Sequence, residues 1–330
     1  MRITVRVAAV QAEPTWLRLS EGVERVVELI GAAAGEGARL IAFPETFLPG
    51  YPWWRWVEAN QWNVEYSTRC RENSMVRDGA EMRAITDAAR DNGIHVVLGF
   101  GERQDRRIYM SQAVIDDSGE LLTVRRKAGL NSVERKVFAS GTPNLPAVHH
   151  TPIGKYGALS GQENQRPLLT RALRADEEQI HIAAWPGSAH GEVAGPDSMT
   201  TVSRMYALEV GAFVLAPCVV VGESAWEGTG SYPRPVAGPT GRARIYGPDG
   251  EEVVDALEEG EEGLLYADLE IGAQAVDGQQ CESGRGTRDR KDRVATRRGS
   301  RRLAAGWQAG PDRWALPMSL GTYPGGIAAC

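Results

Sequence analysis

The sequence predicts an α/β protein in which helices cover the outer faces of β-sheets. Segments that alternate apolar and polar residues, as strands do, are interleaved with segments whose apolar residues recur at helical spacing. Turn sequences at residues 116–119 and 247–250 add hairpins to this pattern. The interleaving continues to about residue 275, so we expect one domain over residues 1–275.

The first strand and helix are the most clearly marked elements. Residues 3–10 alternate in period two and predict a strand. Residues 21–34 place valine and isoleucine on one helical face and predict a helix. Ser20 is the expected N-cap, and Gly35 or Gly37 the expected end of this helix.

The remaining elements follow in the same alternation. Further helices are expected over residues 80–91 and 198–210, and after Pro167, which suits a first helical turn. Further strands are expected over residues 39–43, 94–99, 109–115, 121–126, 156–160, 181–184, 212–221 and 264–269.

Composition excludes several classes of protein. The chain has 330 residues, a formal net charge of -6 and 42% hydrophobic residues, so we expect no nucleic-acid partner. No apolar run approaches the roughly 20 residues of a membrane helix, and the N-terminus lacks a signal-peptide pattern. We therefore predict a cytoplasmic protein that does not bind membranes.

The cysteines do not form a recognisable metal or disulfide pattern. They are scattered, with no C-x-x-C pair and no histidine cluster, which argues against a zinc site or a disulfide framework. Cys218 lies in an apolar run and is interpreted as a small core residue. The other cysteines are Cys70, Cys281 and Cys330.

Three predicted strands end in polar residues of catalytic type. Glu45 follows the strand that ends in Phe43, and Lys127 follows the strand of residues 121–126. The segment 157–164 turns from a buried strand into Ser-Gly-Gln-Glu-Asn. Catalytic groups of α/β folds gather at such strand ends, although each group alone is also typical of an ordinary surface charge.

In combination, these segments resemble the signature blocks of a known family. AVQAEP, FPETFLPGYPWW, RRK followed by SVERKVF, and GALSGQENQRPLL are similar to blocks of the nitrilase superfamily, in its nitrilase and cyanide hydratase branch. The resemblance runs in order from residue 5 to about residue 270. It implies a four-layer αββα sandwich that associates through αββα–αββα dimers, which extend into spiral homo-oligomers.

The resemblance also implies roles for individual residues. Glu45 corresponds to the general base, Lys127 to the triad lysine and Glu134 to the second glutamate. The family's cysteine nucleophile corresponds to Gly161. With a cysteine, a thiolate attacks the nitrile carbon to form a thioimidate, and acid and ammonia follow, without a metal or organic cofactor.

Glycine closes that covalent route. In a comparable catalytic triad, loss of the nucleophile costs about 10⁶ in turnover, or about 8 kcal/mol of transition-state stabilisation. Ser160 is the adjacent hydroxyl, but successive strand residues point to opposite faces, so it is a poor substitute. Gln162, where the family has tryptophan, and the altered stretch 128–131 favour natural divergence over an engineered glycine.

The substrate contacts are less defined than the catalytic positions. Tyr51, Trp185, Glu163 and Asn164 are the candidate substrate-binding residues, and more tryptophans follow Tyr51. The aromatic residues are equally typical of a core or a subunit interface.

Two functions remain open. One is an enzyme with weak or non-covalent activity on a small nitrile, cyanide or amide-like substrate. The other is a pseudoenzyme that binds a ligand or serves as an assembly subunit.

The C-terminal segment, residues 276–330, departs from the family pattern. Between residues 285 and 302 it holds nine Lys or Arg against two Asp, with no apolar period, which predicts a poorly ordered tail. A basic arm that contacts a partner subunit is the alternative. The family's His-Tyr-Ser-Arg-Pro-like stretch is absent, and a reading-frame change near residues 274–281 would account for its loss.

Overall fold

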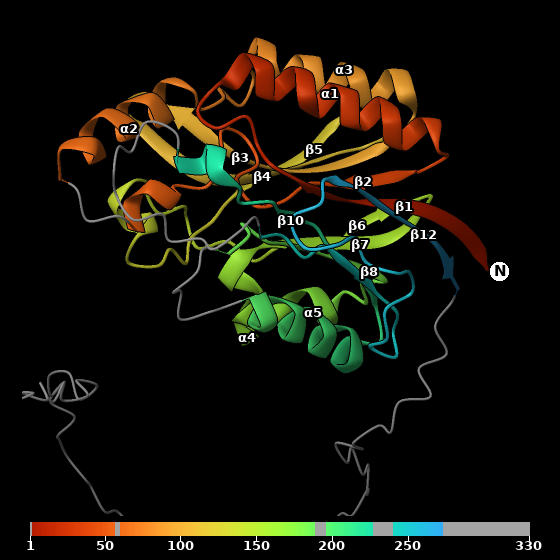
Figure 1. Ribbon diagram of the computed structural model, residues 1–330. Helices are drawn as coiled ribbons and strands as arrows, with labels where there is room; N and C mark the ends of the chain where they lie inside the picture. Colours follow the sequence, from red (N-terminus) through yellow and green to blue (C-terminus); the bar gives the residue numbers. More distant parts are fainter. Residues whose placement is uncertain (1, 57–59, 189–195, 227–239, 273–330) are drawn as a thin grey trace, which may run out of the picture. The chain divides into compact units, whose positions relative to one another are not determined.

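The computed structural model describes residues 2–56, 60–188, 196–226 and 240–272. Two β-sheets lie face to face between outer helices, which confirms the predicted α/β class with helices outside the sheets. In Figure 1, α1 (Leu19–Gly35) and α3 (Ala80–Asn92) cover one sheet, and α4 (Pro167–Ala175) and α5 (Pro196–Val210) cover the other. No helix in these residues is both long and apolar enough to cross a membrane.

The first sheet has its strands in the order β10-β1-β2-β3-β4-β5, with β12 also paired to β1. Strands β1, β2, β3 and β10 run parallel, whereas β4, β5 and β12 join in antiparallel pairs. These strands are β1 (Ile3–Ala12), β2 (Leu40–Ala42), β3 (His95–Gln104), β4 (Arg107–Ile115), β5 (Leu121–Arg126), β10 (Cys218–Val219) and β12 (Gly263–Ile271).

The second sheet has the order β11-β9-β8-β7-β6, parallel in its centre and antiparallel at both edges. Its strands are β6 (His149–Thr151), β7 (Gly154–Ser160), β8 (Ile180–Ala184), β9 (Phe213–Ala216) and β11 (Arg244–Tyr246). The remaining elements are α2 (Asn60–Glu72) and the 3₁₀ turns η1 (Trp53–Trp56), η2 (Glu134–Lys136), η3 (Gly161–Gln165) and η4 (Glu223–Trp226).

Both faces of the first sheet are buried, which explains why its strands are so apolar. On β2, Ile41 packs in the core beneath α1 and α3, whereas Leu40 and Ala42 pack in the core between the two sheets. Strand side chains alternate between faces, so one short strand serves both cores. On the far side, Leu159 of β7 packs against Leu173 of α4.

Most predicted elements are confirmed within a few residues, but the start of α1 differs. The helix begins at Leu19, and Ser20 is not its N-cap. Instead, the backbone N–H of Leu19 donates a hydrogen bond to Oδ1 of Asn73 at 3.0 Å, and Asn73 is the residue that follows α2. The predicted end is confirmed, since α1 finishes at Gly35 and Gly37 adopts a φ of +82°.

The single strand predicted over residues 212–221 is wrong. Pro217, which has no N–H to donate, divides it into β9 and β10. Strand β9 pairs with β8 in the second sheet, whereas β10 pairs with β1 in the first. The chain therefore passes from one sheet to the other at this proline.

The chain divides into two units, residues 1–277 and 278–330. The predicted poorly ordered tail lies outside the described residues, and so does the alternative of a basic arm. Strand β12 is the last described element, and it pairs with β1 from Ile3 to Gln11.

Candidate active site

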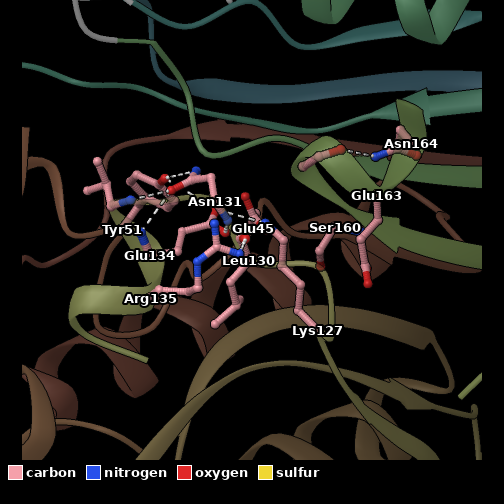
Figure 2. Close-up of polar contacts among 12 residues, drawn as sticks. Glu45, Tyr51, Lys127, Leu130, Asn131, Glu134, Arg135, Ser160, Glu163 and Asn164 are labelled. Atoms are coloured by element: carbon pink, nitrogen blue, oxygen red, sulfur yellow. Dashed lines mark hydrogen bonds and ion pairs between the residues drawn. The ribbon is translucent and has the colours of Figure 1, made fainter. Parts of the chain in front are cut away.

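Glu45, Lys127 and Glu134 meet in one place, between the two sheets' strand ends (Figure 2). Gly161 lies beside the Glu45 carboxylate. Glu45 follows β2 and Lys127 follows β5, both in the first sheet. Glu134 begins η2, and Gly161 begins η3 directly after β7 of the second sheet.

The turn that carries Glu45 depends on Gly99 of the neighbouring strand β3. A Cβ at Gly99 would lie 2.9 Å from the Glu45 Cα and closer still to Pro44 O. Only glycine lets the loop approach this closely. Sequence analysis did not single out Gly99, because nothing in a strand sequence marks a close approach from another loop.

Lys127 is a buried cation held between two carboxylates. Its Nζ lies 2.7 Å from Glu45 Oε1 and 2.8 Å from Glu134 Oε1, and its side chain is 1% exposed. Burial alone would lower the pKa of Lys127, but the two carboxylates raise it above its usual value. The amine therefore stays protonated and is a hydrogen-bond donor.

Glu45 is in the opposite situation, because burial raises its pKa to about 7 against the attraction of Lys127. Glu134 contributes to the same rise through charge repulsion. The second oxygen, Glu45 Oε2, has no hydrogen-bond partner among the described residues. The carboxyl group thus titrates near neutral pH and has one oxygen available.

Glu134 is fixed by Asn131, which sequence analysis noted only as part of an altered stretch. The Asn131 N–H donates to Glu134 Oε2, and Asn131 Oδ1 accepts the Glu134 N–H, both at 2.8 Å. This is the reciprocal pattern of a capping box, which the spacing Asn-x-x-Glu signals in the sequence. Tyr51 also donates its hydroxyl to Glu134 Oε1 at 3.3 Å.

Gly161 lies against the free oxygen of Glu45. Its φ is +48°, a conformation that favours glycine. A Cβ at this position would lie 2.9 Å from the Glu45 carboxyl carbon and closer still to Oε2. The neighbouring Ser160 side chain accepts the backbone N–H of Glu163 in a second capping box. In Figure 2 the Ser160 and Glu163 side chains point the same way, away from Glu45.

Glu163 and Asn164 support the turn from behind. Glu163 is fully buried and accepts two hydrogen bonds from Arg125, at 2.9 and 2.5 Å. Asn164 donates its Nδ2 to Gly161 O at 2.8 Å, while its Oδ1 lies 2.8 Å from His181 Nε2. Direct substrate contact by these two residues remains a prediction.

Behind Asn164, a fully buried chain of polar groups continues to α5. His181 Nδ1 lies 3.3 Å from Glu178 Oε2, and Tyr206 donates its hydroxyl to Glu178 Oε1. Burial, together with the charge of Glu178, raises the pKa of Tyr206 and keeps it protonated. Sequence analysis missed this chain, because Glu178 lies in a polar run like any surface acid, and neither His181 nor Tyr206 stands in a recognisable motif.

Tyr51 and Trp185 line a cavity of ≈ 40 Å³ together with Glu45, Glu134 and Gly161. Trp185 donates its indole N–H to Ser203 at 3.0 Å, so its ring is held in place. At roughly 10–15 Å³ for each water, this volume has room for about three water-sized molecules.

The described cysteines lie in the core. Cys70 and Cys218 are buried, and burial raises the pKa of their thiols to about 12 and about 11. The interpretation of Cys218 as a core residue is confirmed, since it belongs to the core between the sheets. Within the described part of the chain, no group of His, Cys, Asp and Glu is arranged to hold a metal.

Comparison with known proteins establishes the class that this fold and site define. Residues 6–275 match the carbon–nitrogen hydrolase family, and the chain belongs to it. It is 43% identical over 281 residues to a nitrilase of Pseudomonas syringae pv. syringae (strain B728a), which covers 83% of each chain. It is 39% identical over 279 residues to an arylacetonitrilase of Hypocrea virens, in an alignment that covers 81% of this chain and 83% of that one. It is also 39% identical over 280 residues to a cyanide hydratase of Leptosphaeria maculans, with 81% of this chain and 78% of that one covered.

The fold matches solved structures of the same superfamily. A cysteine-to-alanine mutant of the amidase from Nesterenkonia AN1 superimposes with a TM-score of 0.63 at 21% identity. The match covers 80% of this chain and 90% of that one. The superfamily membership predicted from the sequence is confirmed.

Proposed function

We propose that this protein is an enzyme of the nitrilase lineage that activates water directly on a nitrile, cyanide or amide-like substrate. The observation that carries the proposal is the buried Glu45–Lys127–Glu134 cluster beside a glycine. The relatives named nitrilase and cyanide hydratase support this substrate class. Glu45 acts as general base, and Lys127 stabilises negative charge on the substrate.

The covalent route is lost in this proposal, because Gly161 brings no nucleophile. Ser160 is a poor replacement, since its hydroxyl already accepts the Glu163 N–H. The thiols of Cys70 and Cys218 are buried and protonated at neutral pH. Loss of the nucleophile in a comparable triad leaves a residual of about 10³ to 10⁴ over water, so we expect slow turnover.

The pKa of Glu45 supports the role of base. A general base works best when its pKa is near the working pH, and burial raises that of Glu45 to about 7. Glu134 forms the second ion pair with Lys127, through its Oε1 atom. Tyr51 and Trp185 are the proposed substrate contacts, and Glu163 and Asn164 act by holding the turn.

Substrate consumption by the purified chain tests the proposal. Wild type and Glu45→Gln are incubated with cyanide, acetonitrile and acetamide, and intact mass is recorded during turnover. We expect consumption by wild type, a loss of at least ~10² in Glu45→Gln because the base is removed, and no covalent adduct. Glu28→Gln on the exposed face of α1 is the matched control. A substrate adduct on residues 157–164 would contradict the proposal.

The second candidate is a catalytically inactive subunit that binds a ligand or builds an assembly. Its support is the exposed apolar surface of α4 and α5, where Leu168 is 77% and Met205 57% exposed. Exposed apolar patches mark interaction sites. For either candidate we propose a cytoplasmic homodimer formed through this face, an αββα–αββα arrangement that extends to larger spiral oligomers.

Light scattering tests the assembly. Leu168→Lys combined with Met205→Lys is expected to shift the wild-type oligomer to a smaller species. Val64→Lys, which places the same charge on an exposed apolar position of α2, is expected to leave it unchanged. An unchanged mass in the double variant would remove α4 and α5 as the interface.

A further inference from the structure

We infer that this chain has a second binding site, apart from the Glu45 cluster, that takes a small organic monocarboxylate. The site is a cavity of ≈ 420 Å³ lined by residues of β4 and β5 from the first sheet, of β6 and β7 from the second, and of the segment 142–147. Small-molecule sites have volumes of roughly 300–1,000 Å³. No residue that lines this cavity also lines the cavity at Glu45, so the two sites are separate.

Gln112 of β4 is the residue that points to a ligand. It is 3% exposed, and its Nε2 has no hydrogen-bond partner among the described residues. A buried N–H donor without an acceptor costs stability, and most buried polar groups are therefore paired. Gln112 lies directly opposite Arg125 in the β4–β5 ladder, so the amide and the guanidinium leave the same face of the sheet. Together they offer donors to the two oxygens of one carboxylate.

The cavity also carries an excess of positive charge. Its lining includes three guanidinium groups, those of Arg77, Arg125 and Arg126. Arg125 pairs with Glu163, whereas the other two arginines share the single carboxylate of Glu102. Burial would raise the pKa of Glu102, but hydrogen bonds from Arg126 and Arg77 hold it at about 2, so this group is charged. Three cations thus face two carboxylates, and one positive charge is left for a ligand.

The arginines keep donors that their carboxylate partners do not use. Glu163 accepts from two of the five N–H donors of Arg125. Arg77 and Arg126 likewise give two donors each to Glu102. The planar fork of a guanidinium group matches the geometry of a carboxylate, so the remaining donors suit this group of a ligand.

The rest of the lining favours an organic ligand with a single negative charge. Val114, Pro146 and Ala158 are buried and form an apolar part of the wall. His149 adds no charge at neutral pH, because burial lowers its pKa. One excess positive charge suits a monoanion better than a doubly charged phosphate, and the apolar wall offers contacts to a hydrocarbon body. The ligand class is therefore a small monocarboxylate such as benzoate or butyrate.

Calorimetric titration of the full chain with sodium benzoate tests the inference. Benzyl alcohol is the uncharged analogue, and inorganic phosphate is the alternative anion. We expect saturable binding of benzoate, weaker binding of phosphate, and binding of benzyl alcohol that is weaker by at least ~10-fold, because the charged hydrogen bonds are lost.

Variants locate the ligand in this cavity. Gln112→Leu should weaken benzoate binding at least ~10-fold and raise the melting temperature of the ligand-free protein, since the unpaired buried donor is removed. Arg77→Gln should also weaken binding, whereas Arg90→Gln, an exposed arginine of α3 outside the cavity, should not. Glu45→Gln should bind benzoate as wild type does, because Glu45 lines the other cavity.

The opposite results would overturn the inference. Benzoate binding that is unchanged in both Gln112→Leu and Arg77→Gln would place the ligand elsewhere. Phosphate or benzyl alcohol that binds as tightly as benzoate would remove the assignment of a carboxylate ligand, and no binding of benzoate at millimolar concentration would remove the site. None of these outcomes bears on the proposed function, whose own test is substrate consumption by wild type and Glu45→Gln.

Discussion

At the scale of single residues, the site contains more negative than positive charge. Two carboxylates, Glu45 and Glu134, share the single ammonium group of Lys127 in a buried place. One bound proton neutralises the cluster, and burial assigns it to Glu45 by raising the pKa to about 7. The raised pKa that supports the proposed role of Glu45 as a base therefore also makes stability depend on pH.

We expect Glu45 to destabilise the fold as pH rises. The pKa of a glutamate is ordinarily 4.5, and that of Glu45 in the folded protein is about 7, so between these values the folded state holds a proton that the unfolded state has lost. From about pH 5 to about pH 8, the free energy of unfolding of wild type should fall relative to that of Glu45→Gln. Urea denaturation across this range measures it, and parallel curves would contradict the assignment.

Substitution of Gly161 tests the catalytic position. Gly161→Cys should create nitrilase-type ammonia release, because it restores a thiol beside Glu45 and Lys127. Gly161→Ala adds the same Cβ without sulfur and should not raise ammonia release. Both should unfold more easily by about 1–3 kcal/mol, since φ is +48° and the Cβ displaces the Glu45 carboxylate. A folded but inert Gly161→Cys would weaken the roles given to Lys127 and Glu134.

At the scale of elements, the turn η3 is held by the buried chain that runs from α5 through β8 to Asn164. Tyr206 and His181 both contact the Glu178 carboxylate, and Asn164 transmits this fixed arrangement to Gly161 O. The turn is thus braced by side chains from two other elements rather than by its own short helix.

Breaking this chain at different points should have graded effects. His181→Leu removes the ring partner of both Glu178 and Asn164 and should cost about 2–6 kcal/mol of unfolding free energy, at about 1–3 kcal/mol for each buried group that loses its partner. Tyr206→Phe removes one donor and should cost about 1–3 kcal/mol. Chemical denaturation compares them, and equal costs would show that the carboxylate does not depend on the imidazole.

At the scale of the whole molecule, removing residues 278–330 should leave the folded domain intact. Strand β12 is the last strand of the described first sheet, where Ile271 pairs with Ile3, and residues 278–330 form a separate unit. Thermal unfolding of the 1–277 chain is therefore expected to match that of the full chain. A clearly lower melting temperature would assign the basic segment a structural role, as the partner-arm alternative requires.

How far the sequence predicts this molecule depends on how local each signal is. Helices α1 and α3 and the strands β3 to β5 follow from apolar period and turn residues, and the strand-end positions of Glu45 and Lys127 follow from them. Helix α2 has no apolar stripe and was not predicted. The residue after it, Asn73, caps the N-terminus of α1. This contact forms only when the chain folds, so local helix propensity cannot predict it.

The same limit applies within the site. The motif Asn-x-x-Glu signals the contact between Asn131 and Glu134, but the pairing of Glu163 with Arg125 joins two sheets and has no local mark. Likewise, the closeness of Gly161 to Glu45 came from family resemblance, since no pattern in either segment implies it.

The passage of the chain at Pro217 from β9 to β10 links the halves of the sandwich within one residue. Glu45 follows a strand of one half and Gly161 a strand of the other, so any sliding between the halves would pull these two residues apart. Because a single residue connects β9 to β10, the two sheets cannot slide far past each other at this point. The alignment of Glu45 with Gly161 is in this sense built into the backbone.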